Sequence, residues 1–375
     1  MMLSKRIQYT LYVSVIYSLF AVAFSACSGD DESISDSKSG EIAVSTNFDS
    51  VFDVETRGEG SIYKEHILAG GQELPLSIVR LDQNETDGSY PSSYTATNVD
   101  GVGQAPRKGR LRRNNLDILM SFVGIEYYLS HPLHDKTKLI GWYPTVGNGS
   151  TWSVDASGTA TVSFDVNGDT DIIMSNLDLV EVSQPPPNPT TTTTMTFDHL
   201  LTRFRVRVYT YDPDVAGLYG GVKSISLTGK KQTCVATLPD ATTSDKAIVV
   251  FNGNDNLPII RRNPVSNSVI EYNNGVLPVL YYESGQKVTD SALAGYAMVA
   301  PETKVVPETN KVDLVVETEK GSTTTYTVSI AAPTGGFAAG KSYTLDLEFR
   351  TDIKLGIVIK TWVDDGNVEI DKTYN

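Results

Sequence analysis

Side chains that could hold a metal ion are few in this chain, which has four histidines and two cysteines among 375 residues. His131 and His134 are followed by Asp135, so two imidazoles and a carboxylate could contact one metal ion. Pro132 prevents a helical presentation of these groups, and no distant third ligand is apparent. A surface loop is therefore the favoured interpretation of this segment, and neither a metal nor any other cofactor is expected.

Sequence motifs of catalysis are also missing. No G-x-S-x-G elbow, phosphate-binding P-loop or H-E-x-x-H zinc motif occurs. The paired carboxylates at 30–31 and 364–365 lie in polar segments, where water solvates both charges. His199 lies at the entry of a predicted strand and is expected to be packed or hydrogen-bonded. The chain is therefore not expected to be an enzyme.

The two cysteines have different surroundings. Lys5 and Arg6 precede an apolar stretch, residues 7–26, that polar residues interrupt, which is typical of a secretion signal. Residues 24–27 (Phe-Ser-Ala-Cys) resemble a bacterial lipobox, in which the cysteine, here Cys27, is diacylated and becomes the mature N-terminus. The alternative is an ordinary signal peptide with a chance cysteine. Cys234 lies in an alternating segment, which predicts a buried structural thiol and not a nucleophile.

Charge and composition exclude several classes of protein. The net charge is -14 and only 20% of the residues are charged, while Thr, Ser, Gly and Tyr are abundant. A coiled coil needs more charge, and a disordered polyelectrolyte does not carry 40% hydrophobic residues. Nucleic acid is not expected as a partner, because its phosphates would be repelled.

Alternation of apolar and polar residues dominates from about residue 41 onward, which is typical of half-buried β-strands. The apolar positions share one face in four predicted strands: Ala160, Val162, Phe164 and Val166; Phe204, Val206 and Val208; Tyr343, Leu345, Leu347 and Phe349; Tyr326, Val328 and Ile330. One helical segment is predicted at about 114–128. The whole pattern predicts an all-β fold of sandwich type.

A proline-rich break divides the chain. Residues 184–189 (Gln-Pro-Pro-Pro-Asn-Pro) precede five threonines, and prolines cannot continue a β-ladder. We therefore assign residues 1–26 to a signal peptide, 27–40 to an acidic tether, 41–188 to an N-terminal domain and 189–375 to a C-terminal domain. Each of the two domains is long enough to bury its own core.

Five further segments are informative together: 141–144 (Gly-Trp-Tyr-Pro) with 169–172 (Asp-Thr-Asp-Ile), 197–204 (Phe-Asp-His-Leu-Leu-Thr-Arg-Phe), 296–301 (Tyr-Ala-Met-Val-Ala-Pro), 340–345 (Gly-Lys-Ser-Tyr-Thr-Leu) and 357–362 (Ile-Val-Ile-Lys-Thr-Trp). Their order and spacing, combined with the lipobox, resemble the fimbrillin family, the two-domain pilins and pilus-associated lipoproteins of type V pili. This resemblance covers most of the chain.

The resemblance implies two tandem transthyretin-like β-sandwich domains in an outer-membrane lipoprotein of the cell surface. It also implies assembly by strand exchange into a fimbrium that supports adhesion. In that scheme an arginine-specific protease removes an N-terminal strand, which opens an apolar groove, and a C-terminal strand of the next subunit fills it. The implied partners are other pilin subunits, the processing protease and the outer membrane, which the lipid contacts.

The chain has residues suited to the displaced strand and to its removal. Ile42, Val44 and Phe48 share one face of the segment 41–48, interrupted by Thr46. Arg57, followed by Gly58, is the first arginine after Cys27 and is the candidate cleavage site. A solvated loop arginine is the alternative. The basic run 107–113 is a rival site, for which an exposed loop is the favoured interpretation.

Two alternating segments near the C-terminus are candidates for the donor strand. The first contains Ile353, Leu355, Ile357 and Ile359, and the second contains Val368 and Ile370. The alternative is that they form the last hairpin of the subunit's own second domain. Because both ends of the chain have usable strands, we expect a polymerising stalk-type or accessory subunit.

Aromatic residues leave a second function open. Three tryptophans and 19 tyrosines could stack on sugar rings, as in a surface lipoprotein that binds glycans and does not polymerise. Most of them fall on predicted strand faces, where packing in the core is the commoner outcome.

Overall fold

A computed structural model of the chain describes residues 43–48, 73–84, 86–95, 105–114, 117–124, 136–181, 194–240, 244–261, 276–302, 311–320, 325–333, 335–350 and 353–361. Strands predominate in these ranges, with one short helix, α3 (Val215–Tyr219), and one 3-10 helix, η3 (Asp290–Ala292). The prediction of an all-β fold is confirmed. No helix in the described ranges is long and apolar enough to cross a membrane.

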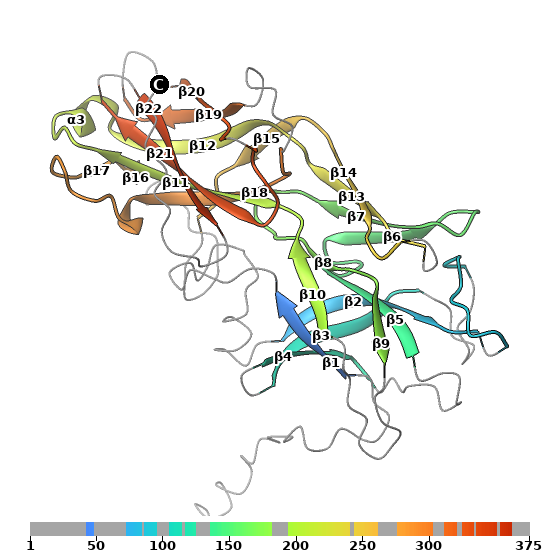
Figure 1. The fold of residues 1–375 in the computed structure, drawn as a ribbon. Coiled ribbons are helices and arrows are strands. Elements are labelled where there is room, and N and C mark those ends of the chain that lie inside the picture. Colours follow the sequence, from blue (N-terminus) through green and yellow to red (C-terminus); the bar gives the residue numbers. More distant parts are fainter. Residues whose placement is uncertain are drawn as a thin grey trace, which may run out of the picture.

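The N-terminal strands form an eight-stranded sheet that closes on itself through the pairing of β2 with β5 (Figure 1). Its members are β1 (Ala43–Phe48), β2 (Leu74–Asp82), β3 (Arg107–Asn114), β4 (Asp117–Phe122), β5 (Lys136–Tyr143), β8 (Ile173–Ser175), β9 (Asp178–Glu181) and β10 (Thr194–His199). The strand order is β2-β3-β4-β1-β10-β8-β5-β9, and β2 also pairs with β5. Seven strands therefore close into a ring, and β9 extends the pairing along β5.

A four-stranded sheet packs against this ring and contains strands from both sides of the proline-rich break. It has the order β14-β13-β7-β6 and consists of β6 (Ser150–Val154), β7 (Ala160–Asp165), β13 (Thr233–Thr237) and β14 (Ile248–Asn252). The inward residues Phe164 and Cys234 are cross-strand partners. Since β10, β13 and β14 all follow residue 188, the pairing of strands does not coincide with the predicted domain boundary.

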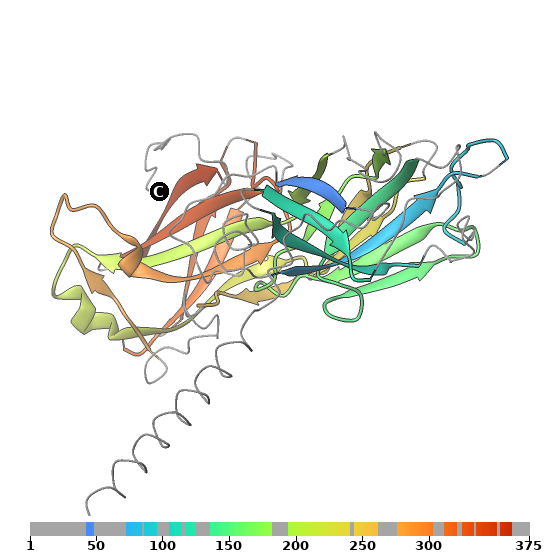
Figure 2. The same cartoon turned by 90° about the horizontal axis from the view of Figure 1, so that it is seen from below.

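Two five-stranded sheets form the other end of the elongated molecule (Figure 2). The first consists of β11 (Thr202–Thr210), β17 (Leu280–Tyr281), β18 (Leu293–Val299), β21 (Lys341–Phe349) and β22 (Ile353–Thr361). The second consists of β12 (Gly221–Lys230), β15 (Asp255–Pro258), β16 (Leu277–Pro278), β19 (Lys311–Thr318) and β20 (Thr325–Ala331). Their apolar faces pack together, as the buried sets on β11 and β21 predicted.

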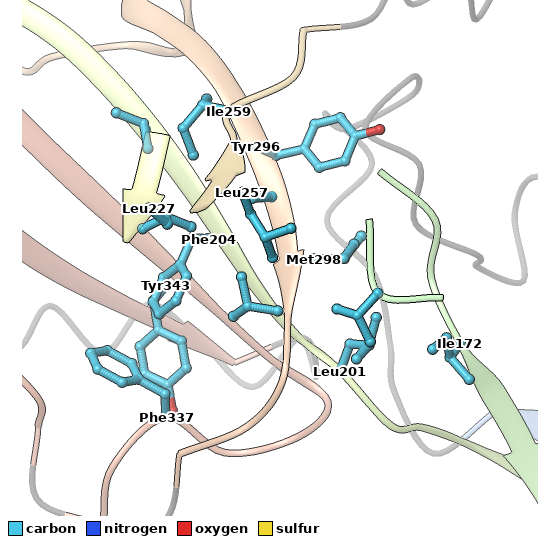
Figure 3. Close-up of a cluster of buried hydrophobic side chains, with 14 of the residues drawn as sticks. Ile172, Leu201, Phe204, Leu227, Leu257, Ile259, Tyr296, Met298, Phe337 and Tyr343 are labelled. Atoms are coloured by element: carbon cyan, nitrogen blue, oxygen red, sulfur yellow. The ribbon is translucent and has the colours of Figure 1, made fainter. Parts of the chain in front are cut away.

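A continuous hydrophobic core runs through both ends of the molecule. Figure 3 shows where the ends join: Ile172 and Leu201 lie near Met298 of β18. The backbone carbonyl of Ile172 accepts a hydrogen bond from the amide of Leu200 at 2.8 Å, and that of Gly168 accepts one from Met298 at 2.8 Å. The division into two tandem transthyretin-like domains stays a prediction.

Two local predictions were wrong. The helix expected at about 114–128 is wrong for the part of this segment that the structure describes, because β3 ends at Asn114 and β4 occupies 117–122. The basic run 107–113 is not an exposed loop, since β3 pairs with β2 on one side and with β4 on the other. Gly109 and Leu111 point inward there, and a Cβ at Gly109 would lie 2.0 Å from the Cδ1 atom of Ile78.

Candidate strand-exchange site

β1 completes the ring of strands between two neighbours that are distant in sequence. It pairs antiparallel with β4 through residues 43–46 and parallel with β10 through residues 45–48. Without β1, both β4 and β10 would have an unpaired edge, which is a template for another strand. The ring therefore contains one strand-sized site that the N-terminal segment of the chain fills.

Side chains of β1 contribute to the interior of the ring. Val44 is 0% exposed and lies beside Met120, its cross-strand partner on β4. Thr46, the residue that interrupts the apolar face in the sequence, is also buried, and its hydroxyl donates a hydrogen bond to the carbonyl of Ile118 at 3.1 Å. Because this hydroxyl has a partner, a threonine fits the inward face.

The site that β1 occupies is lined by a separate hydrophobic cluster. It consists of Val44 itself and of buried residues from the ring and from β9, namely Leu76, Ile78, Leu111, Ile118, Met120, Phe122, Leu139, Ile173, Val180, Met195 and Phe197. All of these side chains are at most 3% exposed. Removal of β1 would therefore expose apolar surface as well as two strand edges, and both favour capture of a replacement strand.

Most of the predicted processing residues lie outside the described ranges. These are Cys27, Ile42, Arg57 and Gly58. Phe48 lies in β1 with Phe197 of β10 as its backbone partner, but its side chain is not described. β1 precedes every other described strand in the chain, and residues 49–72 connect it to the rest of the ring. A single cut between residues 48 and 73 would separate β1 covalently from the rest of the ring.

At the other end, the first donor candidate is paired within the subunit. Ile353, Leu355, Ile357 and Ile359 lie in β22, which pairs antiparallel with β21 from Ile353 to Thr361. β22 is the last strand of its sheet, so it has one neighbour among the described strands. This is the arrangement of a final hairpin. The second candidate, Val368 with Ile370, lies outside the described ranges.

The cysteine and histidine side chains that the structure describes are buried. Cys234 is buried, as expected, and burial raises the pKa of its thiol to about 12. His199 is also buried, as expected, and its Nδ1 atom lies 2.7 Å from the Oδ2 atom of Asp171. His131 and His134 are not described, and the described part of the chain contains no cluster of His, Cys, Asp and Glu that could hold a metal ion.

The described tryptophans contribute to packing. Trp142 is fully buried, and Trp152 stacks on it with ring centroids 5.9 Å apart and an interplanar angle of 14°. The rings of Tyr94 and Trp152 are nearly perpendicular, with their centroids 6.0 Å apart. Trp362 lies outside the described ranges. Glycan stacking on these two indole rings is therefore not favoured.

Sequence reasoning located β1 but missed three features of the site. It did not identify the parallel partner β10, it treated Thr46 as an interruption, and it did not place β4 at all. The hydrogen bond from Thr46 to the backbone carbonyl of Ile118 explains why a threonine is accepted at this buried position. The alternation of Met195 and Phe197 just after the threonine run was the available signal for β10.

Comparisons with solved structures find similar proteins at low sequence identity. A "putative cell adhesion protein" from Bacteroides uniformis is 12% identical, with 86% of this chain and 98% of that chain covered and a TM-score of 0.46. A fimbrial protein from Bacteroides vulgatus is 13% identical, with coverage of 86% and 99% and a TM-score of 0.40. A fimbrial assembly protein from Parabacteroides distasonis is 10% identical, with coverage of 85% and 96% and a TM-score of 0.34.

Sequence comparison gives a more direct result. No curated protein matches the chain. A family profile described as fimbrillin-like matches residues 127–362, which extend from the segment before β5 to the end of β22. This match covers well over half of the 375 residues. The chain belongs to the fimbrillin-like family.

Proposed function

We propose that the chain is a structural or accessory subunit of a type V fimbrium that assembles by exchange of β1. The subunit is exported as a lipoprotein, is cleaved after Arg57 and loses β1. The empty site between β4 and β10 then accepts a C-terminal strand from a neighbouring subunit. Family membership supports the fimbrial role, and the position of β1 supports the exchange.

The observation that carries the proposal is the placement of β1 within a closed ring. A strand at the edge of a sheet would leave one unpaired neighbour when removed, whereas β1 leaves two. A replacement strand can therefore form two backbone ladders and bury its alternate side chains in the cluster around Met120 and Phe197. Both contributions favour a long-lived contact between subunits.

Export and anchoring follow from the N-terminal sequence. Diacylation of Cys27 anchors the precursor in the outer membrane and positions the acidic tether, residues 27–40, before β1. The segment from Cys27 to Arg57 carries eight acidic and two basic residues. Its removal makes the remaining subunit less negative, which reduces the repulsion between subunits as they approach.

The donor strand is drawn from the C-terminal segment. Donation of β22 would break its nine-residue pairing with β21, whereas donation of the segment beyond residue 362 would not. Val368 and Ile370 have the spacing of Val44 and Thr46, so both side chains can point into the ring. We therefore favour Val368 and Ile370 as the inserted residues. β22 stays paired with β21 in its own subunit and connects that subunit to the donated segment.

The experiment examines SDS-resistant ladders of fimbriae in the cells that make this protein. Ladders are expected for the natural chain and are expected to disappear for Arg57→Lys, which keeps the charge but removes the arginine that the protease requires. Deletion of residues 363–375 should also abolish ladders, with a folded monomer retained.

A matched control distinguishes the two basic sites. Arg110 lies in β3 within the rival run and forms an ion pair with Glu73 at 2.8 Å. Because β3 is paired on both sides, Arg110→Lys should leave the ladders unchanged. Ladders that persist in both Arg57→Lys and the deletion variant would refute exchange by this route, and ladders lost only in Arg110→Lys would move the cleavage to the rival site.

A further inference from the structure

β14 has an unusual combination of properties for the last strand of a sheet. It pairs with β13 on one side, and no described strand pairs with its other side. Figure 1 shows it as the outermost strand of the four-stranded sheet. Proteins commonly protect such edges with charged residues or proline. β14 has the sequence Ile-Val-Val-Phe-Asn and contains neither.

Two large apolar side chains of β14 face the solvent. Ile248 is 69% exposed and Val250 is 50% exposed. The alternate residues, Val249 and Phe251, point inward and pack on the core. The exposed pair is therefore not required to hold the sheet together, and exposed apolar residues that adjoin a free edge are typical of an interaction surface.

The outer face next to β14 carries no charge in its two central rows. The register places Ile248 beside Thr237 and Val250 beside Val235, and the rows continue across β7 to β6. The members are Ser153, Thr161, Thr237 and Ile248 in one row, and Thr151, Ser163, Val235 and Val250 in the other. In a chain of net charge -14, such a face is where two copies can approach with the least repulsion.

We propose that β14 is a self-association edge, at which the β14 strands of two copies pair antiparallel about a twofold axis through Val250. This register places Val250 of one copy beside Val250 of the other, Val249 opposite Phe251, and Ile248 opposite Asn252. The two four-stranded sheets become one continuous sheet across the two copies. Backbone hydrogen bonds and the buried Val250 pair hold the contact.

A second copy is the occupant that these observations favour. An isologous contact needs a patch that is complementary to itself, and an uncharged, short strand meets that need in the antiparallel register. β14 is separate from β1, β4 and β10, so this side-by-side contact is independent of strand exchange. It would connect neighbouring subunits laterally and not head to tail.

Disulfide trapping tests the contact in cells that display the protein. Val250→Cys places two thiols within the Cα separation that a disulfide requires, because facing residues of antiparallel strands lie about 4.5–5.5 Å apart. Treatment with a mild oxidant should give a covalent dimer on a non-reducing gel. Cys234 is buried and does not compete.

Matched variants separate this contact from others. Thr151→Cys lies on β6, the opposite edge of the same sheet, is also exposed, and should give no dimer. Val250→Cys in the Arg57→Lys background should still give the dimer, since β14 takes no part in strand exchange. Equal yields from Val250→Cys and Thr151→Cys, or no dimer from Val250→Cys, would overturn the proposal.

A charge substitution gives an independent measurement. Val250→Lys places like charges directly opposite each other and should weaken dimerisation of the detergent-extracted chain about a hundredfold by sedimentation. Thr151→Lys should leave the dimer unchanged. Because both side chains point away from the core, both variants are expected to keep the natural melting temperature. A dimer that persists with Val250→Lys would assign the association to another surface.

Discussion

Replacement of Val44 by alanine should make β1 leave the ring more often without unfolding the rest of the molecule. Val44 is 0% exposed and contributes the apolar contact of β1 that the structure describes. The substitution removes two carbon atoms from the cluster, which loses about 1.6 kcal/mol of transfer free energy at about 0.8 kcal/mol per buried carbon. The remaining cavity brings the loss to about 2 kcal/mol.

This loss has a measurable effect on the opening of β1. About 2 kcal/mol corresponds to an increase of about thirtyfold in the population of the open state. Hydrogen exchange detected by mass spectrometry reports that population, because the amides that pair with β1 exchange only when it leaves. The peptides to follow cover residues 117–122 of β4 and 194–199 of β10, and the hairpin of β19 and β20 serves as the internal reference.

Exchange should accelerate about thirtyfold in β4 and β10 and stay unchanged in β19 and β20. Val123→Ala is the matched control, because Val123 is 57% exposed directly after β4 and its truncation should change nothing. Equal acceleration in all strands would mean that β1 opens only with the whole molecule. Unchanged exchange in β4 and β10 would mean that Val44 does not hold β1. Either result would refute the argument.

Three further predictions concern other parts of the fold. Gly109→Ala should lower the free energy of unfolding by about 1–3 kcal/mol in a denaturant titration, because the added Cβ would overlap Ile78. Gly217 has open space around it, so Gly217→Ala should not lower the free energy of unfolding. Equal losses in the two variants would contradict the packing argument. Burial, together with Asp245 and Asp198, raises the pKa of Asp178 to about 6, above the value of about 3.9 for an unfolded aspartate. The stabilisation by this carboxyl group is complete below about pH 4 and is lost as the pH rises through 6. Asp178→Asn should therefore raise the free energy of unfolding by about 1–2 kcal/mol at neutral pH, a value that allows for the partial exposure of the side chain. At pH 4 the same substitution should change the free energy of unfolding little. A gain of equal size at both pH values would argue against the raised pKa. Finally, Cys234 should react with a thiol reagent only in denaturant, because its pKa is raised to about 12 by burial; rapid labelling of the native chain would contradict this.

Strands with strict alternation were predictable from the sequence because their apolar faces pack on one core. The buried set Ala160, Val162 and Phe164 and the buried set on β21 both lie where the pattern placed them. The segment of β4 was not predictable in the same way. Its residues Ile118, Leu119 and Met120 are consecutive apolar residues that suit a helix as well as a strand, and only pairing with β1 and β3 decides between the two.

Long-range pairing limited the prediction of organisation and of the site. The sequence contains a strong break at residues 184–189, yet β13, which follows the break, pairs with β7, which precedes it, and β14 adds to the same sheet by pairing with β13. The basic run in β3 was misassigned because a cluster of charges suits an exposed loop, whereas Gly109 and Leu111 between the basic residues point inward in a strand that is paired on both sides. The inward position of Thr46 depends on one carbonyl of β4, which no local pattern indicates.

The N-terminus of the subunit in assembled fimbriae tests the central claim most directly. Mass spectrometry of fimbriae isolated from the cell surface should find Gly58 as the first residue and no peptide from β1. That result would mean that every polymerised subunit has lost β1, which leaves the site between β4 and β10 to the strand of a neighbouring subunit. An assembled subunit that still begins at acylated Cys27 and retains Val44 would contradict strand exchange at β1.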